Sequence, residues 1–295
     1  MNTSKCLFCN SEKIKHSSYL DTVFNKKTFT YKECKTCELI FVQPLPTIDD
    51  YVAMYPVTYQ GEIETINKNR YEKNLNIVQK YSKGKKMLDY GCGQGGFLLE
   101  ANDLGFECVG TEFSADLVAS MNQKLPFAKF QTIDSFLTNE NNIEKFDIIL
   151  LNNVLEHLTN PHEIMAKLHQ KLAPNGIFML IGPIENNFSF SLLFRKFYFY
   201  IQKNIFKKYA QDAPTHIFYA TAKNQQHFLD LVGLKEVYFE IGETAWPFPD
   251  RLSDAKTQLQ KIMYFVAKIS LKLQKKFPKW GNHFIYVGEN KTKNH

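Results

Sequence analysis

Four glycines stand within six positions of one segment, and a carboxylate precedes them. The segment reads LDYGCGQGGF, residues 88–97, and follows a short apolar run. Gly91, Gly93 and Gly96 match the spacing of a dinucleotide loop, whose backbone N–H groups and following helix receive a pyrophosphate. Asp89, however, lies two residues before the first glycine, where its negative charge would repel a diphosphate. The segment therefore predicts a ligand that approaches the backbone closely and is not anionic near Asp89.

Two carboxylates distinguish between the cofactors that such a loop can hold. S-adenosylmethionine carries an ammonium and a sulfonium cation, which a carboxylate such as Asp89 attracts. Glu112, at the end of the next predicted strand, can accept two hydrogen bonds from a ribose diol. Because a dinucleotide also needs an acid at the position of Glu112, only Asp89 distinguishes the two cofactors, and it favours S-adenosylmethionine. We predict that Gly91, Gly93 and Gly95 line its methionine end; the alternative is a tight turn without a ligand.

Four cysteines near the start of the chain form two pairs with two residues inside each pair. Two such pairs can surround one tetrahedral Zn²⁺ and leave no open position, which predicts a structural zinc site at Cys6, Cys9, Cys34 and Cys37. Disulfides and an iron–sulfur centre are the alternatives. No export signal opens the sequence, and a reducing compartment disfavours disulfides. The isolated Cys92 and Cys108 are interpreted as packing residues.

Two histidines are candidates for a base that removes a proton from an acceptor. His157 lies in NNVLEHL, just after a predicted strand, and His216 lies in DAPTHIFYAT with Tyr219 three residues later. Histidine titrates near neutral pH, which suits a general base. His157 can equally support the cofactor loop instead. Replacing either histidine by alanine is expected to abolish turnover without greatly weakening cofactor binding.

The elements that must position these residues alternate regularly. The segments KMLDYG, ECVGTEF, AKFQTI, FDIILL and GIFMLIGP are predicted strands, and predicted helices separate most of them. Near-continuous apolar strands that alternate with helices indicate a parallel sheet covered on both faces. The ligand of such a sheet binds at the carboxyl ends of its strands. Both the glycine loop and Glu112 lie at such ends.

These motifs resemble those of the class I S-adenosylmethionine-dependent methyltransferases. LDYGCGQGGF, VGTEFS, FDIILLNNVLEHL and LAPNGIFMLIGP follow in the order of that family, over about residues 70–242 and the last strand. The resemblance implies an α/β, Rossmann-like, seven-stranded and mostly parallel sheet with an antiparallel last strand. It also implies that Asp134 and Ser135 lie near the adenine and Asn152 beside the methionine end.

The first part of the chain has a resemblance of its own. CLFCN, YKECKTCELIFVQPLP and MYP are similar to a small β-rich zinc-binding module that precedes the methyltransferase domain in some bacterial enzymes. These enzymes include sugar C-methyltransferases and proteins of surface-polysaccharide clusters. We therefore expect a zinc-binding module over residues 1–59 and a methyltransferase domain over 60–295. Helical insertions are expected at about 184–220 and 243–282.

The basic residues are concentrated in the two insertions. Residues 187–211 hold five Lys or Arg and residues 255–279 hold seven, and neither stretch contains an acid, although the chain's net charge is only +6. Leu259, Ile262, Val266, Ile269 and Leu273 follow the spacing of one helical face. The two stretches are expected either to form lid helices with solvated lysines or to bind an anionic or lipid-linked substrate or an anionic membrane surface. Nucleic acid is a less favoured partner.

The composition, 44% hydrophobic and 22% charged, is that of an ordinary globular protein. With no apolar run of about 20 residues and no export signal, we expect a cytoplasmic protein, with peripheral contact at the inner membrane face as a further expectation. The predicted function is methyl transfer to a small molecule, favouring a nucleotide-linked or lipid-linked sugar in glycan biosynthesis. An RNA methyltransferase and a non-catalytic S-adenosylmethionine-binding protein are the alternatives.

Overall fold

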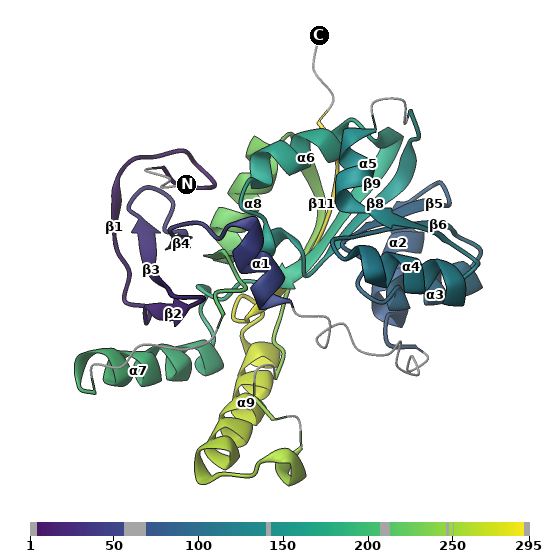
Figure 1. Cartoon of the computed structure of the whole chain (residues 1–295). Coiled ribbons are helices and arrows are strands. Elements are labelled where there is room, and N and C mark those ends of the chain that lie inside the picture. The colour runs from purple at the N-terminus through teal and green to yellow at the C-terminus, as the bar shows by residue number, and fades with distance from the viewer. Residues whose placement is uncertain are drawn as a thin grey trace. The chain divides into compact units, whose positions relative to one another are not determined.

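The computed structural model describes residues 5–55, 69–139, 143–206, 213–245, 248–249 and 251–291 (Figure 1). The expected boundary between residues 59 and 60 lies outside the described residues, as do residues 207–212 within the first expected insertion. The chain divides into two compact units. Unit 1 comprises residues 1–54, 182–228 and 239–285, and unit 2 comprises residues 55–181, 229–238 and 286–295. This division by compactness differs from the one expected from the sequence, whose boundaries stay a prediction.

A seven-stranded sheet has the order β11-β12-β9-β8-β5-β6-β7, which confirms the predicted Rossmann-like sheet with its antiparallel end (Figure 1). Its strands are β5 (Lys86–Tyr90), β6 (Glu107–Glu112), β7 (Lys129–Thr132), β8 (Phe146–Asn152), β9 (Leu172–Pro183), β11 (Leu234–Gly242) and β12 (His283–Asn290). The strands from β9 to β7 pair in parallel. The chain order reverses between β5 and β8, which is where open α/β sheets bind their ligands.

The central strands are buried because helices connect them. Ile148, Ile149, Leu150 and Leu151 of β8 are fully buried in succession, as expected for a strand covered on both faces. The connecting helices are α3 (Gly96–Asp103), α4 (Ala115–Lys124), α5 (Ile133–Thr138) and α6 (Pro161–His169), and α2 (Glu72–Tyr81) precedes β5. Ser114 caps the start of α4, since its hydroxyl accepts the Leu117 N–H.

A small antiparallel sheet lies in unit 1. It joins β1 (Ile14–His16), β2 (Thr22–Phe24), β3 (Lys27–Cys34) and β4 (Ile40–Gln43) to β10 (Phe218–Tyr219). Phe218 pairs with Phe41, so residues that follow the first insertion complete a sheet built mainly from the first 43 residues. The ring of Phe8 stacks on Phe228 in α8 (Ala222–Leu231), with 4.3 Å between centroids. A short helix α1 (Ile48–Met54) follows β4.

Both expected insertions contain a long helix within the described residues, while their bounds stay a prediction. Helix α7 (Phe190–Asn204) and helix α9 (Gln258–Lys276) both lie in unit 1 and pack on each other. Val266 and Ala267 of α9 form a small core with Phe248, against which Phe190 and Phe194 of α7 pack. A short 3-10 turn, η3 (Leu252–Asp254), precedes α9. A capping box between the N-cap Thr257 and Gln260 in the first turn begins that helix.

Candidate functional site

The glycine loop joins β5 to α3 at the carboxyl edge of the sheet. Gly91, Gly93 and Gly95 all have left-handed backbone angles, with φ of 79°, 53° and 76°. The N–H groups of Gly91 and Cys92 both donate to the carbonyl of Thr111 in β6, at 2.9 Å. The loop is thus fixed to the next strand by its backbone, and glycine supplies conformations that other residues adopt only with strain.

Asp89 is the buried carboxyl group of this edge. Its side chain lies in β5, only 2% exposed, and its Oδ1 has no hydrogen-bond partner among the described residues. Burial, and to a lesser degree the nearby Glu112, raises the pKa of Asp89 to about 8. A buried carboxyl oxygen without a partner is unfavourable unless a ligand or water satisfies it. Among the residues predicted to hold a cofactor, Asp89 is therefore the one whose ionised form a bound cation would stabilise most directly.

Glu112 ends β6 and already binds the loop. Its Oε2 accepts the Gly93 N–H at 2.9 Å, and its Oε1 accepts the Phe113 N–H at 2.7 Å. Each carboxylate oxygen has a second lone pair, so both can still accept a further hydrogen bond. Glu112 therefore presents hydrogen-bond acceptors, as the sequence predicts, and it also holds the glycine loop in place, which the sequence does not predict.

The other predicted cofactor residues lie at the ends of the neighbouring strands in the same unit. Asp134 and Ser135 are exposed in the first turn of α5, directly after β7, and Thr132 caps that helix by accepting the Ser135 N–H. Asn152 ends β8, and its Oδ1 accepts the amide of Asn153 at 3.1 Å. These residues share the carboxyl edge with Asp89 and Glu112, as the sequence predicted for strand ends, and their contact with a cofactor stays a prediction.

His157 lies in the 3-10 turn η2 (Leu155–His157) that follows β8. Its Nδ1 is 3.1 Å from the Tyr55 hydroxyl, and its Nε2 is 3.8 Å from a carboxylate oxygen of the buried Glu156. A half-buried imidazole between a hydroxyl and a carboxylate can accept a proton, and it can equally hold its turn in place. The structure thus supports both interpretations of His157.

His216 and Tyr219 lie in unit 1, in the segment that leads into β10 and α8. His216 Nδ1 is 2.5 Å from Oε2 of Glu185, and the rings of His216 and Tyr219 are 6.2 Å apart. Glu185 is only 5% exposed, and it also accepts a hydrogen bond from Arg195. Glu185 and Arg195 are not predicted from the sequence. No short-range spacing connects them to His216, because the fold brings three separate segments together.

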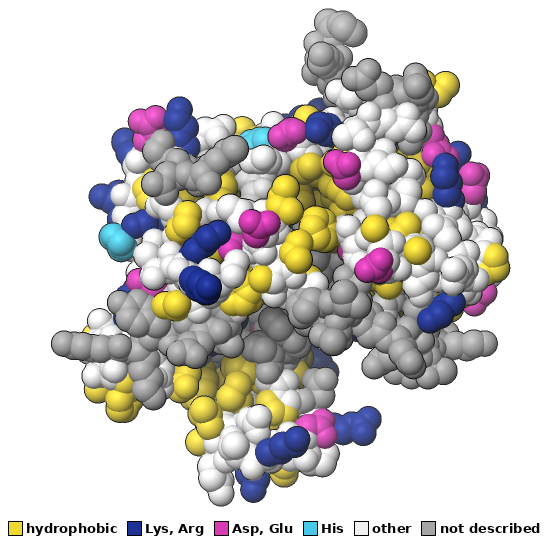
Figure 2. Space-filling model, viewed as in Figure 1, with side chains coloured by type: hydrophobic (Ala, Val, Ile, Leu, Met, Phe, Trp, Pro, Cys, Tyr) yellow, Lys and Arg dark blue, Asp and Glu magenta, His cyan; other side chains and the backbone are white. Residues whose placement is uncertain are grey.

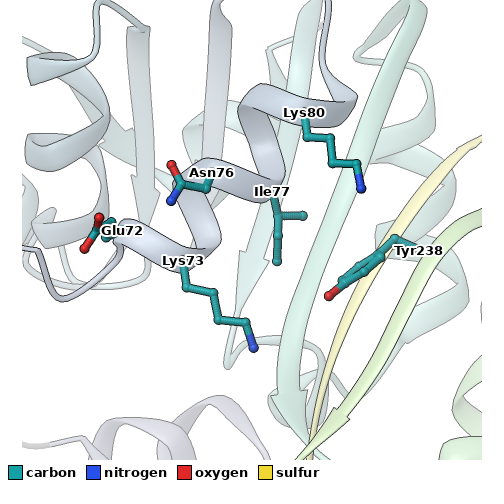
Figure 3. A pocket seen from close by; sticks show the side chains of 6 residues that line it. All are labelled: Glu72, Lys73, Asn76, Ile77, Lys80 and Tyr238. Carbon is teal, nitrogen blue, oxygen red and sulfur yellow. The ribbon is translucent and has the colours of Figure 1, made fainter.

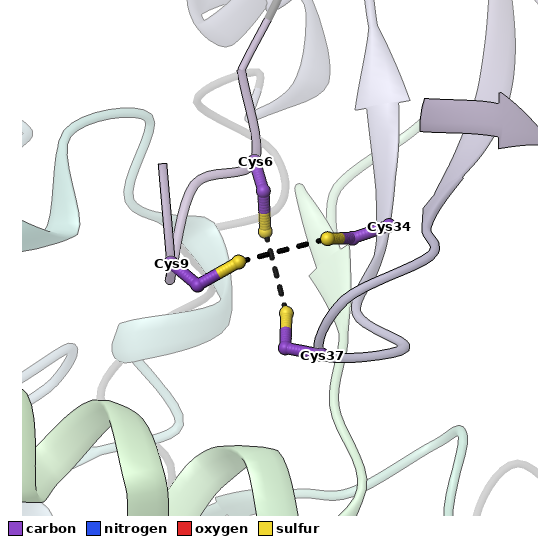
Figure 4. A group of neighbouring side chains, drawn as sticks. All are labelled: Cys6, Cys9, Cys34 and Cys37. Carbon is purple, nitrogen blue, oxygen red and sulfur yellow. Dashed lines mark hydrogen bonds between the residues drawn. The ribbon is translucent and has the colours of Figure 1, made fainter. Parts of the chain in front are cut away.

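The four predicted cysteines converge in unit 1, as Figure 4 shows. Their sulfur atoms all lie within 4.8 Å of one another, with 3.5 Å between Cys6 and Cys37 and 3.6 Å between Cys9 and Cys34. The residue after each pair, Asn10 or Glu38, has a positive φ, so the two pairs turn the chain in the same way. These distances are far longer than the ~2.05 Å of a disulfide.

A surface pocket in unit 2 lies apart from the residues predicted from the sequence. Figure 3 shows side chains of α2 facing Tyr238 of β11 across it. The pocket is lined by Glu72, Lys73, Asn76, Ile77, Lys80 and Tyr238. None of the predicted site residues is among them.

A pair of substitutions in the glycine loop tests its packing. A Cβ at Gly91 would lie 2.6 Å from a methyl group of Val154, whereas a Cβ at Gly93 would meet nothing within 4 Å. Both glycines have positive φ, so both alanine variants bear a backbone penalty of about 1 kcal/mol. We expect Gly91→Ala to lower the free energy of unfolding by about 2 kcal/mol more than Gly93→Ala. Equal losses in urea denaturation would contradict the packing described.

The chain is similar in part to curated methyltransferases. It is 35% identical over 106 residues to the ubiquinone biosynthesis O-methyltransferase of Glaesserella parasuis, covering 33% of this chain and 44% of that protein. It is 37% identical over 134 residues to the enzyme of the same name from Pasteurella multocida, covering 40% of this chain and 55% of that protein. The chain therefore spans about half the length of the curated relatives it matches.

Solved structures share the fold at low sequence identity. A chain of the complex between the Haloferax volcanii Trm112 methyltransferase activator and a methyltransferase superposes with a TM-score of 0.57 at 11% identity, over 82% of this chain and 98% of that chain. An S-adenosylmethionine-dependent methyltransferase from Archaeoglobus fulgidus superposes with a TM-score of 0.50 at 16% identity, over 81% and 99%. The family model described as a methyltransferase domain matches residues 65–238, more than half of the sequence, and the chain belongs to that family.

Proposed function

We propose that this protein transfers a methyl group from S-adenosylmethionine to a small-molecule acceptor. The observation that carries the proposal is Asp89, a buried carboxyl with an unpartnered oxygen beside the glycine loop. A cation placed there would satisfy that oxygen and lower the raised pKa of Asp89. Family membership supports the same cofactor.

The residues present fit this cofactor. Gly91, Gly93 and Gly95 let its methionine part approach the backbone, and the lone pairs of Glu112 suit the ribose hydroxyls. Asp134 and Ser135 are accessible at the start of α5 for the adenine, and Asn152 ends the strand next to β5. When bound, S-adenosylmethionine supplies an electrophilic methyl group, so the protein chiefly has to orient the acceptor and remove its proton.

His157 and His216 are the proposed bases, with Tyr219 beside the second of them. Each imidazole lies within hydrogen-bonding or ion-pairing distance of a group that can orient it: Tyr55 for His157 and Glu185 for His216. A base held by a second group is the usual arrangement in acid–base catalysis. The proton of the acceptor would pass to a ring nitrogen as the methyl group arrives.

The proposed acceptor is a nucleotide-linked or lipid-linked sugar in glycan biosynthesis. The similarity of the cysteine-bearing segment to modules of sugar methyltransferases supports it. A second candidate is an oxygen acceptor of another small molecule, because the matched curated relatives are named as O-methyltransferases. RNA methylation and cofactor binding without catalysis are weaker alternatives, which the same assay separates.

A labelled-methyl assay tests this function. The protein is incubated with labelled S-adenosylmethionine and with sugar nucleotides, lipid extracts or RNA, alongside the His157→Ala and His216→Ala variants. We expect label in a sugar nucleotide or lipid fraction, with a loss of at least 100-fold in the variant that lacks the base. Cofactor affinity should change little in that variant. Label that enters RNA alone would contradict the acceptor class, and full activity in both variants would contradict a histidine base.

We also propose that the four cysteines hold a structural Zn²⁺. Four thiolates at Zn–S distances of about 2.3 Å stand about 3.8 Å from one another in a tetrahedron, close to the observed separations. Four protein ligands leave no position for a substrate, so such an ion would stabilise unit 1 rather than react. Cys34 ends β3 and Cys37 precedes β4, and the ion would therefore fix the turn between these two strands.

Metal analysis tests the zinc proposal. We expect one zinc per chain after purification, and release of that zinc by a chelator should lower the unfolding temperature of the protein. Cys37→Ser should lose the metal, whereas the matched control Cys92→Ser should keep it, because Cys92 lies in the glycine loop of the other unit. A full complement of zinc in Cys37→Ser would refute this site.

Peripheral contact with an anionic membrane is the proposed role of the two insertions. Of the predicted apolar face of α9 only Val266 is buried, while Leu259, Ile262 and Ile269 are exposed together with Phe265. On α7, Leu193, Phe197 and Tyr200 are also exposed. Figure 2 shows hydrophobic side chains next to Lys and Arg where α9 lies in Figure 1. Within the described residues no helix is long and apolar enough to cross a bilayer. Apolar residues mixed with lysines suit the interface instead.

Vesicle co-sedimentation tests this contact. We expect binding to anionic vesicles at low salt that weakens as salt rises, because part of the attraction is electrostatic. Ile262→Asp with Phe265→Asp should reduce the bound fraction at least tenfold, while the control Ile143→Asp, at another exposed apolar position in unit 2, should not. No binding by the wild-type protein, or a face buried in a stable dimer, would contradict the proposal.

A further inference from the structure

A buried carboxylate in unit 1 is held between two basic side chains. Glu185 follows β9, and its Oε1 accepts a hydrogen bond from Arg195 Nη1 at 2.6 Å. Its Oε2 is 2.5 Å from His216 Nδ1. The side chains of Glu185, Arg195 and His216 are 7%, 13% and 15% exposed, so water screens these charges little. Arg195 lies on α7, and the first insertion therefore supplies one member of the cluster.

The charge state of Glu185 follows from its two partners. Burial alone would raise its pKa, but the charge of Arg195, followed by that of His216 when its imidazole is protonated, lowers that pKa to about 2. Glu185 is therefore ionised at neutral pH. A buried carboxylate without compensation would be strongly destabilising, so the guanidinium of Arg195 is the group that lets Glu185 stay charged.

This arrangement determines what His216 can do. With Nδ1–H donating to the carboxylate, a neutral imidazole carries its lone pair on Nε2, the atom that would receive a proton. A carboxylate alone would also favour the imidazolium form, which cannot act as a base. Arg195 offsets that effect because its positive charge shares the same carboxylate. The carboxylate can then orient the ring without forcing it to be protonated.

The tyrosines around this cluster in unit 1 are uncharged at neutral pH, whereas Lys196 and the Lys203–Asp21 ion pair are charged groups beside it. Tyr19, before β2, donates its hydroxyl to the carbonyl of Glu185 at 2.8 Å, and Tyr219 of β10 lies 3.4 Å from the Tyr31 hydroxyl of β3. Burial raises the pKa of all three tyrosines, that of Tyr19 to about 12. The adjacent Lys196 donates to Asn186 at 2.8 Å instead of to Glu185.

We propose that Arg195 is a positioning residue that acts through Glu185 to hold His216 neutral and oriented for proton removal. The inference rests on the proposed function, in which His216 is a base. It extends that function to α7, a helix that shares no sequence motif with His216. A helix whose outer face is proposed to contact a membrane thereby also contributes a charge to the buried cluster.

The proposal predicts pKa changes of opposite sign in two variants. Ring signals of histidine-labelled protein are followed by NMR against pH without substrate, and the His216→Ala spectrum identifies those of His216. Glu185→Gln should lower the pKa of His216 by about one unit, because the carboxylate is lost. Arg195→Met should raise it by about one unit, because the carboxylate is no longer offset. Arg195→Lys should restore most of the wild-type value, and Lys268→Met on α9 should leave it unchanged.

The outcomes separate this inference from the proposed function. If the pKa of His216 does not change, or changes in the same direction in Glu185→Gln and Arg195→Met, the role of Arg195 is overturned even when the enzyme is active. If Arg195→Met does not fold, the titration of Arg195→Lys decides. A pKa of His216 that falls in Arg195→Lys as far as it falls in Glu185→Gln would then overturn the role of Arg195. In the labelled-methyl assay, the acid limb of the rate–pH profile should move to higher pH in Arg195→Met. If no methyl transfer occurs, but the pKa of His216 moves in opposite directions in Glu185→Gln and Arg195→Met, the proposed function is refuted and the role of Arg195 is retained.

Discussion

The burial of one carboxylate beside a glycine loop is the constraint on which the rest of the account depends. Asp89 lies inside the sheet, and burial holds its pKa near 8, so the free protein keeps an unsatisfied acid at the place where the cofactor of this fold binds. The loop is tied to β6 by backbone hydrogen bonds and by Glu112. These features hold the edge in place and leave there a carboxyl group whose ionised form a cationic ligand stabilises and a pyrophosphate does not.

Unit 1 is held together by contacts between segments that are distant in sequence. Strand β10 completes the small sheet of the cysteine-bearing region, and Glu185, Arg195 and His216 meet from three parts of the chain. A second carboxylate, Glu243, accepts hydrogen bonds from Ser191 of α7 and Ser270 of α9, which joins the two insertion helices. The first residues of the chain and both insertions thus form one compact body.

The sequence predicted the features that depend on local patterns. The alternation of apolar strands and helices gave the sheet, and the spacing of the cysteines anticipated the cluster of four sulfurs. The six-residue helix α5 was missed because so short an element has little periodicity. The apolar pattern of α9 is real, but most of that face is exposed, and periodicity alone cannot say what covers a face. Glu185 and Arg195 were missed because only tertiary packing joins them to His216.

Calorimetry with the demethylated cofactor and with NADH tests the central claim most directly. S-adenosylhomocysteine keeps the ammonium group, so it should bind, release a proton at pH 7 and bind more tightly as pH rises towards 8, because Asp89 must ionise to pair with it. Asp89→Asn should bind more weakly and release no such proton, and NADH should give no heat. Tight uptake of NADH, with no heat from S-adenosylhomocysteine or S-adenosylmethionine, would contradict the account.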